Sequence, residues 1–327
     1  MMRRIMIFCL TFGALLSASP ESALAQNKRS AVDNAPSPDA EQAALDWVRD
    51  VGGTVERHPG RIFSVNLNGT NVTADGLKNL AGLTGLRSLS LLDTNVTDAG
   101  LKELAGFKSR FYLEFDRSRI SDTTLRILRE VDGLHIVNVG ESVDLHRSRV
   151  TDAGLKELAG LKVLHLHLSE TGITDAGLKD IAAFKHLKSL GLQRSKVTPA
   201  GLKELARCTA LENLYLDPSQ ISDATLRSLR KFEGLHLLMM NGQLMLSGSQ
   251  VTEAGLQELA DLKDLKRLEL SDLEITDAGL RTIAGFDSLQ SLNLGYTAVT
   301  DTGLQELADM KSLKALQLDG TTVTYAG

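Results

Sequence analysis

The chain has 327 residues, of which 43% are hydrophobic but only 4% are aromatic. Charged residues make up 24% of the chain, and this balance excludes wholesale disorder. The formal net charge of −5 argues against nucleic acid as a partner, because a phosphate-binding surface needs a basic excess or a basic patch. A composition rich in leucine and poor in aromatic side chains indicates a core built from many similar, small packing positions.

The N-terminal segment has the pattern of an export signal. Arg3 and Arg4 precede an apolar run over 5–18, and Ala23 and Ala25 provide small residues at the two positions that a signal peptidase reads. The run is shorter than the roughly 20 residues that cross a bilayer. We therefore expect residues 1–25 to be a signal peptide cleaved near Ala25, with an uncleaved anchor as the alternative. The mature protein is expected to be secreted or periplasmic, without a membrane span.

The next segment is expected to lead into a capped repeat array. Residues 26–39 are polar and contain proline, which predicts a flexible linker. Residues 40–61 predict an N-terminal cap, formed by an amphipathic helix over 41–51 with Trp47 on its apolar side and a hairpin turning near Pro59. Such a cap is needed because the first repeat of an array has a bare hydrophobic end.

From residue 62 to 327 one phrase returns, as VTDAGLKELAG at Val96 and ITDAGLKDIAA at Ile173. Its first residue, the marker of each repeat, is Val72, Val96, Ile120, Val150, Ile173, Val197, Ile221, Val251, Ile275, Val299 or Val323. Leucines seven and five residues before the marker predict a short strand with one buried face. The Thr or Ser after the marker predicts a helix N-cap, and the following Asp suits the first helical turn.

Three details of the repeats carry further expectations. The hydroxyl residue two before each marker is expected to bridge backbone groups of adjacent coils, with Leu273 breaking this ladder and altering the turn. Cys208 fills a core position and is expected to be inert. The repeats that begin at Ile120 and Ile221 are about six residues longer, and their extra residues within 134–142 and 235–243 are expected to bulge at one rim. These bulges either carry contacts or only record an internal duplication.

The repeat phrase resembles the TDAGL-type leucine-rich repeats of secreted bacterial proteins, as in planctomycetes, and is similar to the cysteine-containing repeats of F-box proteins. The departures are Ala74, Pro199, Glu253 and Tyr325 at the usual Asp, and a hydroxyl where the F-box relatives have Cys. The resemblance implies an α/β solenoid of about 11 repeats of about 24 residues. It implies a curved parallel sheet on the concave face, short helices on the convex face, and binding of proteins or peptides on the sheet.

The candidate site lies on the predicted concave face. Carboxylate and imidazole side chains from three successive strands, together with polar and aromatic neighbours, are the candidate partner-binding residues: Glu114, Asp116, Asp144, His146, His165, His167, Gln193, Tyr215 and Asp217. Glu114, Asp144 and His167 are expected to stack side by side. Tyr215 is expected to have Met245 as an apolar neighbour. The cluster is open to three interpretations: solvated strand residues, a pH-sensitive partner patch, or a divalent metal site such as one for Zn²⁺.

No phosphate-binding glycine loop, metalloprotease motif or nucleophile–base set is present in the sequence, so we expect neither an enzyme nor a cofactor. The leading hypothesis is an exported, non-enzymatic scaffold that binds a protein or peptide on its concave sheet. The alternative is a cell-envelope structural protein that self-associates through an uncapped edge near Tyr325.

Overall fold

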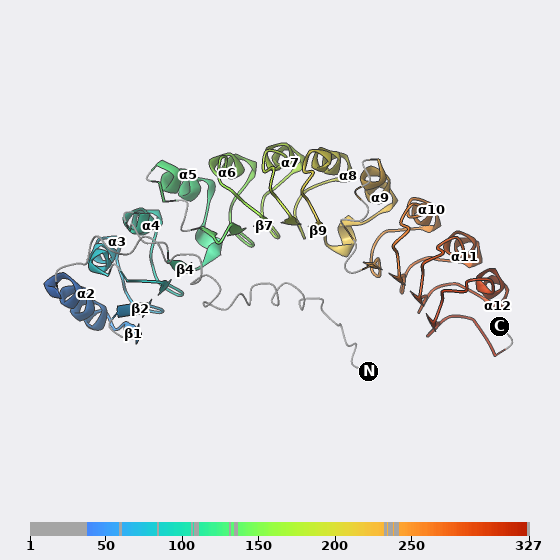
Figure 1. Ribbon diagram of the computed structural model, residues 1–327, viewed down its shortest axis with the longest axis horizontal. Coiled ribbons are helices and arrows are strands. Elements are labelled where there is room, and N and C mark those ends of the chain that lie inside the picture. The colour runs from blue at the N-terminus through green and yellow to red at the C-terminus, as the bar shows by residue number, and fades with distance from the viewer. Residues whose placement is uncertain are drawn as a thin grey trace.

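The computed structural model describes residues 38–325, apart from 59–60, 84, 106, 108–110, 131, 134–136, 232–233, 235–237 and 239–241. The predicted signal peptide over 1–25, and the linker up to residue 37, lie outside the described residues. Figure 1 shows an arc in which helices follow the outer, convex side and short strands line the inner, concave side. This is the α/β solenoid that the repeats predict.

Most coils of the array contribute a strand of three residues. The strands are β1 (Thr54–His58), β2 (Arg61–Asn66), β3 (Ser88–Ser90), β4 (Tyr112–Glu114), β5 (Asn138–Val139), β6 (Ser142–Asp144), β7 (His165–His167), β8 (Ser189–Gly191), β9 (Asn213–Tyr215), β10 (Gln243–Met245), β11 (Arg267–Glu269), β12 (Ser291–Asn293) and β13 (Ala315–Gln317). The central residue of each strand from β2 to β12 whose burial is described, such as Leu166 or Leu292, is buried, while its neighbours point to the concave surface.

Short helices form the return path of each coil. The α-helices are α2 (Pro38–Asp50), α3 (Ala74–Leu77), α4 (Asp98–Ala105), α5 (Asp122–Glu130), α6 (Asp152–Glu157), α7 (Asp175–Ile181), α8 (Pro199–Leu202), α9 (Asp223–Arg230), α10 (Glu253–Gln257), α11 (Asp277–Ile283) and α12 (Asp301–Leu304). The 3₁₀ turns are η1 (Lys78–Gly82), η2 (Arg117–Arg119), η4 (Lys203–Arg207), η5 (Pro218–Gln220) and η7 (Gln305–Leu307). No helix in the described part of the chain is long and apolar enough to cross a membrane.

The N-terminal element packs as a cap. Helix α2 begins at Pro38, a residue suited to the first turn of a helix, so it takes in two residues that the sequence placed in the linker. Trp47 is half-buried against the core, and a Cβ on Gly76 would lie 2.8 Å from its ring. Strands β1 and β2 form the antiparallel hairpin, and β2 is also the first repeat strand because it pairs in parallel with β3.

The concave surface is divided, whereas the sequence predicts one continuous sheet. Among the described residues the strands form an N-terminal sheet β1–β4, a central sheet β5–β9 and a C-terminal sheet β10–β13. The breaks fall at the two longer repeats. In the first of them, β5 turns back through Gly140 and Glu141, both with positive φ, and pairs antiparallel with β6. This hairpin occupies the edge of β6 that would otherwise pair with β4.

The turn after the last strand before each break also differs. In the other repeats, the residue three before the marker is left-handed, as in Arg147 (φ 59°) and Glu170 (φ 57°). At the breaks this turn is replaced by η2 and η5, and Pro218 cannot take a positive φ. The Gln220 side chain then accepts a hydrogen bond from the Arg194 backbone N–H at 3.1 Å, where other coils use a backbone carbonyl.

The repeat phrase is explained by contacts between coils. The Asp152 carboxylate accepts hydrogen bonds from the N–H of Thr174 at 2.9 Å and from its hydroxyl at 2.5 Å. It also lies against Gly177, where a Cβ would come within 2.3 Å of Asp152 Oδ1. Thus the Asp of one repeat requires both the Thr and the Gly of the next. The same carboxylate–threonine staple joins Asp122 to Thr151, Asp175 to Thr198, Asp223 to Thr252, Glu253 to Thr276, Asp277 to Thr300 and Asp301 to Thr324.

The two longer repeats replace this Gly with a threonine. The Thr124 hydroxyl donates to Asp98 Oδ1 at 2.6 Å. The Thr225 hydroxyl instead donates to the Gln220 carbonyl at 2.7 Å, since the preceding repeat has Pro199 in place of the carboxylate. Thr198, which precedes Pro199, makes no side-chain capping bond, whereas Thr174 and its equivalents cap as predicted.

The prediction that the hydroxyl residues two before the marker bridge backbone groups of adjacent coils is wrong, although the Ser195 hydroxyl accepts a hydrogen bond from the Gln220 side chain of the next coil. The hydroxyls of Thr94 and Thr171 donate to the carbonyl three residues earlier, inside the same turn. A left-handed residue, Asp93 or Glu170, precedes each of these threonines and folds the chain back toward this carbonyl. Leu273 occupies the same place as a buried side chain, and Asp272 keeps the left-handed conformation, so the turn there is conserved.

The interior is one continuous leucine core. The predicted core slot is filled by Phe107, Phe184, Phe286 and Cys208, each less than a tenth exposed. Burial raises the pKa of the Cys208 thiol to about 11, which keeps it protonated and inert at neutral pH.

Candidate functional site

The central sheet brings together most of the predicted site residues. Along β6, β7, β8 and β9 the parallel register aligns Asp144, His167, Gly191 and Tyr215 in one row. A second row aligns Ser142, His165, Ser189 and Asn213. His146, Gln193 and Asp217 follow their strands at the turn. The concave face of this sheet, from residue 142 to 217, is called the central face below.

Glu114 and Asp116 lie apart from the central face, contrary to the prediction that Glu114 stacks beside Asp144. Glu114 ends β4 in the N-terminal sheet, and its Oε2 accepts a hydrogen bond from the Ser90 hydroxyl at 2.7 Å. The β5–β6 hairpin and the altered turn η2 separate it from β6. Asp116 is the N-cap of η2 and accepts from the Ser118 N–H at 2.9 Å. Hydrogen bonding to the Ser118 side chain, and to a smaller extent this backbone bond, holds the pKa of Asp116 below its usual value.

An ion pair spans this break in the sheet. Arg117 of η2 lies 3.2 Å from Asp144 Oδ2, and the Asp144 side chain is only 19% exposed. The other Asp144 oxygen lies 3.5 Å from His146 Nδ1 and accepts a hydrogen bond from the His146 N–H at 3.2 Å. Asp144 is therefore a charged centre between two sheets, held from both sides.

His167 of β7 adds a titratable group to the central face. Burial lowers the pKa of His167 below its ordinary 6.5, and the nearby His165, His146 and Arg117 act in the same direction. The negative charge of Asp144 opposes them. His167 is consequently neutral at pH 7, and protonation at lower pH would add positive charge to the middle of the central face.

Strand β8 forms the floor of the central face. Gly191 and Ser189 are buried although both point to the concave side, because neighbouring side chains cover them. Tyr215 shares a hydrogen bond with Ser189, and burial raises its pKa. Met245, predicted as its apolar neighbour, lies on β10 in the C-terminal sheet and is not paired with β9. The tyrosine ring is instead oriented by the central sheet itself.

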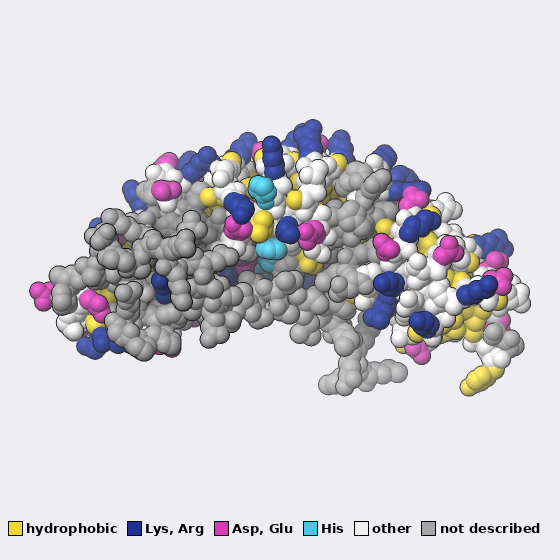
Figure 2. Space-filling model, in the orientation of Figure 1, with side chains coloured by type: hydrophobic (Ala, Val, Ile, Leu, Met, Phe, Trp, Pro, Cys, Tyr) yellow, Lys and Arg dark blue, Asp and Glu magenta, His cyan; other side chains and the backbone are white. Residues whose placement is uncertain are grey.

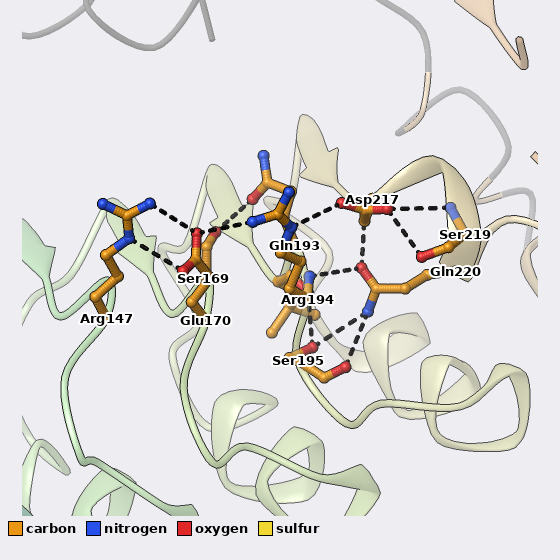
Figure 3. A network of polar contacts seen from close by, with 10 residues as sticks. Arg147, Ser169, Glu170, Gln193, Arg194, Ser195, Asp217, Ser219 and Gln220 are labelled. Carbon is orange, nitrogen blue, oxygen red and sulfur yellow. Dashed lines mark hydrogen bonds and ion pairs between the residues drawn. The ribbon is translucent and has the colours of Figure 1, made fainter. Parts of the chain in front are cut away.

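A ladder of alternating charge runs along the turn edge of the central face (Figure 3). Glu170 accepts two hydrogen bonds from Arg147, the shorter at 3.0 Å, and these lower its pKa. Arg194 lies 3.6 Å from Glu170 and 3.4 Å from Asp217. Asp217 also caps η5 by accepting from the Ser219 N–H. This edge is thus held in a fixed geometry by ion pairs from four coils.

Gln193 lies beside the ladder and accepts a hydrogen bond from the Ser169 hydroxyl. The sequence did not single out Arg117, Arg147, Glu170 and Arg194. They all lie three residues before a marker, and the alternating charge of Arg147, Glu170 and Arg194 in successive repeats is the signal that could have shown the ladder.

The convex side offers a different surface. Figure 2 shows Lys and Arg side chains along the outer edge of the arc, with Asp and Glu between them. Several of these cations pair with an acid of the next helix, as Arg227 does with Glu258 and Arg281 with Glu306, both at 3.0 Å. Such pairs balance the positive charge that a phosphate-binding surface would need.

The metal interpretation finds no support in the geometry. Within the described ranges, no group of three or more His, Cys, Asp or Glu side chains is arranged to hold a metal ion. Asp144 instead forms an ion pair with Arg117 at 3.2 Å and lies 3.5 Å from His146 Nδ1.

Comparisons with known proteins agree with the coil geometry. Residues 161–182 and 288–308 match the family model described as Leucine Rich repeat. No curated protein matches the sequence.

Solved structures with a similar chain path include two internalins from Listeria monocytogenes. InlF is 19% identical over 76% of this chain and 66% of its own, with a TM-score of 0.37. Internalin C2 is 17% identical over 86% of this chain and 92% of its own, with a TM-score of 0.33. The plant peptide hormone receptor RGFR1, in complex with RGF2, is 15% identical over 82% of this chain, with a TM-score of 0.42. This chain spans 48% of that receptor and less than two thirds of InlF.

The strands and helices of the described coils, the recurring phrase and the two matched segments identify the fold of this chain as a leucine-rich repeat solenoid.

Proposed function

We propose that the protein is an exported, non-enzymatic scaffold that binds a protein or peptide partner on its central face. The observation that carries this proposal is the arrangement of β6 to β9, where four aligned strands present imidazole, carboxylate, amide and phenol groups side by side. Chemically varied groups on a rigid, solvent-facing sheet can read the side chains and backbone of a bound chain.

Rigidity supports this use of the surface. The Arg147–Glu170–Arg194–Asp217 ladder fixes one edge of the central face, and the Arg117–Asp144 pair fixes the opposite corner. Side chains that are already held lose less conformational entropy when a partner binds. Tyr215 and His167 flank the glycine of β8 and are the side chains best placed to anchor a partner.

The test is capture of a partner on immobilised protein, its identification by mass spectrometry, and measurement of its affinity in purified form. We expect the combined His167→Ala and Tyr215→Ala variant to bind at least about tenfold more weakly, since buried interface anchors each contribute upward of about 1 kcal/mol. The matched control is Gln317→Ala, the equivalent concave position of β13, which should bind like the wild type. Unchanged affinity of the combined variant would refute the central face as the binding surface.

The alternative is self-association at the C-terminal sheet. Among the described strands, β13 pairs only with β12, and its residues Ala315, Leu316 and Gln317 are all exposed. Light scattering over a hundredfold range of concentration distinguishes the two proposals. A constant monomer mass rejects self-association. A mass that rises with concentration, and that returns to the monomer value in Leu316→Lys, favours it. Export is tested separately, by N-terminal sequencing of the protein recovered from outside the cytoplasm, with Gln26 expected first.

A further inference from the structure

The N-terminal sheet contains a polar hollow that is separate from the central face. Its volume is about 190 Å³, and it is lined only by polar side chains: Thr54, Glu56, Ser64, Asn66, Asn68, Ser88, Ser90 and Glu114. This set is called the polar hollow below. Sites for drug-sized molecules are roughly 300–1,000 Å³. The polar hollow is therefore the size of one side chain rather than of a whole metabolite.

Strand register explains how these residues meet. One row runs from Glu56 through Ser64 and Ser88 to Tyr112, and the next runs from Thr54 through Asn66 and Ser90 to Glu114. Carboxylates therefore stand on the first and last strands of the sheet, with hydroxyls and amides between them. The β1–β2 hairpin of the cap provides one wall, so the cap contributes binding groups as well as covering the core.

One hydroxyl in the polar hollow is shared between two acceptors. The Ser90 hydroxyl lies 2.7 Å from both Asn68 Oδ1 and Glu114 Oε2. A hydroxyl has one proton, so it satisfies only one of these acceptors at a time. Asn68 Oδ1 already accepts from the Leu92 N–H at 2.7 Å. The Glu114 carboxylate is thus the acceptor that an incoming N–H donor would complete.

The charge and shape of the surroundings select a cation. Neither Glu56 nor Glu114 forms an ion pair with any described side chain. Tyr112, two residues before Glu114 on β4, is 47% exposed and pairs in register with Ser88 of the polar hollow. A guanidinium group offers five N–H donors in a planar fork and stacks on aromatic rings, which matches carboxylates, amides and a tyrosine.

We propose that the polar hollow binds an arginine side chain of the protein partner. This inference rests on the proposed function, because it specifies the chemistry of a residue that the scaffold recognises. It places a second contact region away from the central face, on the same concave side of the arc (Figure 1).

The experiment measures fluorescence anisotropy of a labelled peptide, Gly-Ser-Arg-Ser-Gly, against the same peptide with citrulline in place of arginine. Citrulline keeps the shape of the side chain but removes its charge. We expect the arginine peptide to bind the full chain at low salt at least tenfold more tightly than the citrulline peptide. Glu114→Gln, which retains an acceptor for Ser90, should weaken the arginine peptide about threefold or more, and Tyr112→Ala about twofold or more.

The matched control is Glu269→Gln, because Glu269 occupies the equivalent row of the C-terminal sheet and accepts from Asn293 at 2.8 Å. It should leave the affinity unchanged. Equal binding of the citrulline peptide, or an unchanged affinity in Glu114→Gln, overturns the proposal. The His167→Ala and Tyr215→Ala variant separates the two claims, since it should lose the protein partner but keep the arginine peptide.

Discussion

The staple between coils can be tested by adding one methyl group. In Gly177→Ala the new Cβ would lie 2.3 Å from Asp152 Oδ1 and 3.0 Å from Leu155 Cδ1. A leucine methyl can shift by a few tenths of an ångström, but the carboxylate is held in place by two hydrogen bonds from Thr174. The substitution must therefore displace Asp152 and break both bonds.

The expected cost follows from these contacts. Two hydrogen bonds to a charged group at a partly exposed site contribute about 1.5 kcal/mol each, so their loss costs about 3 kcal/mol. Alanine in a helix gains up to about 1 kcal/mol over glycine. We expect the free energy of unfolding to fall by about 2 kcal/mol, the reverse of the usual effect of this substitution.

The assay is urea unfolding followed by circular dichroism, in a double-mutant cycle with Asp152→Ala. Once the carboxylate is absent, Gly177→Ala should become nearly neutral, so the two substitutions should be strongly non-additive. Gly285→Ala is the control, because its Cβ would meet only the Thr282 carbonyl at 3.4 Å. A neutral or stabilising Gly177→Ala in the wild-type background, or additive effects in the cycle, would refute the reasoning.

Three further outcomes are expected. Because burial lowers the folded-state pKa of His167, the unfolded chain binds the extra proton first, so the free energy of unfolding should decrease as pH falls below 6.5. In urea titrations from pH 7.5 to 5, His167→Gln should reduce the dependence of this free energy on pH. An equal dependence in both proteins would contradict the prediction. Because the pKa of Cys208 is raised to about 11, Ellman's reagent at pH 8 should react only after unfolding, and rapid stoichiometric reaction of the native protein would count against the buried thiol. Zn²⁺ should leave the melting temperature unchanged, whereas a rise that His167→Gln abolishes would show a metal site.

The sequence predicts the strand and helix within one coil better than it predicts the contacts between successive coils. Leu166 and Leu168 are fully buried where the pattern places a strand, and Thr174 caps a helix as expected. These features depend on neighbours within a few residues. The periodic sequence does not show which atoms of successive coils meet, so the Asp152–Thr174 staple was read only as an interaction with the helix dipole.

The difficulty of predicting contacts between coils also explains which of the predicted site residues lie together and which do not. Successive strands were assumed to pair, which holds for Asp144 and His167 on β6 and β7. It fails for Glu114, because β5 pairs antiparallel with β6 and occupies the edge of β6 that faces β4. The length of the insertion was visible in the sequence, but its antiparallel pairing depends on positive φ angles at Gly140 and Glu141. The ion-pair ladder was missed because its residues lie in turns, outside the alternating strand positions.

The most direct test of the central claim is site-specific photo-crosslinking of the captured partner. A benzoylphenylalanine replaces Asn213, which faces the concave side of β9, or Lys179, which is exposed on the convex helix α7. The account predicts a covalent adduct with the partner from position 213 and none from position 179. Crosslinking from position 179 alone would contradict binding on the concave face of the central sheet.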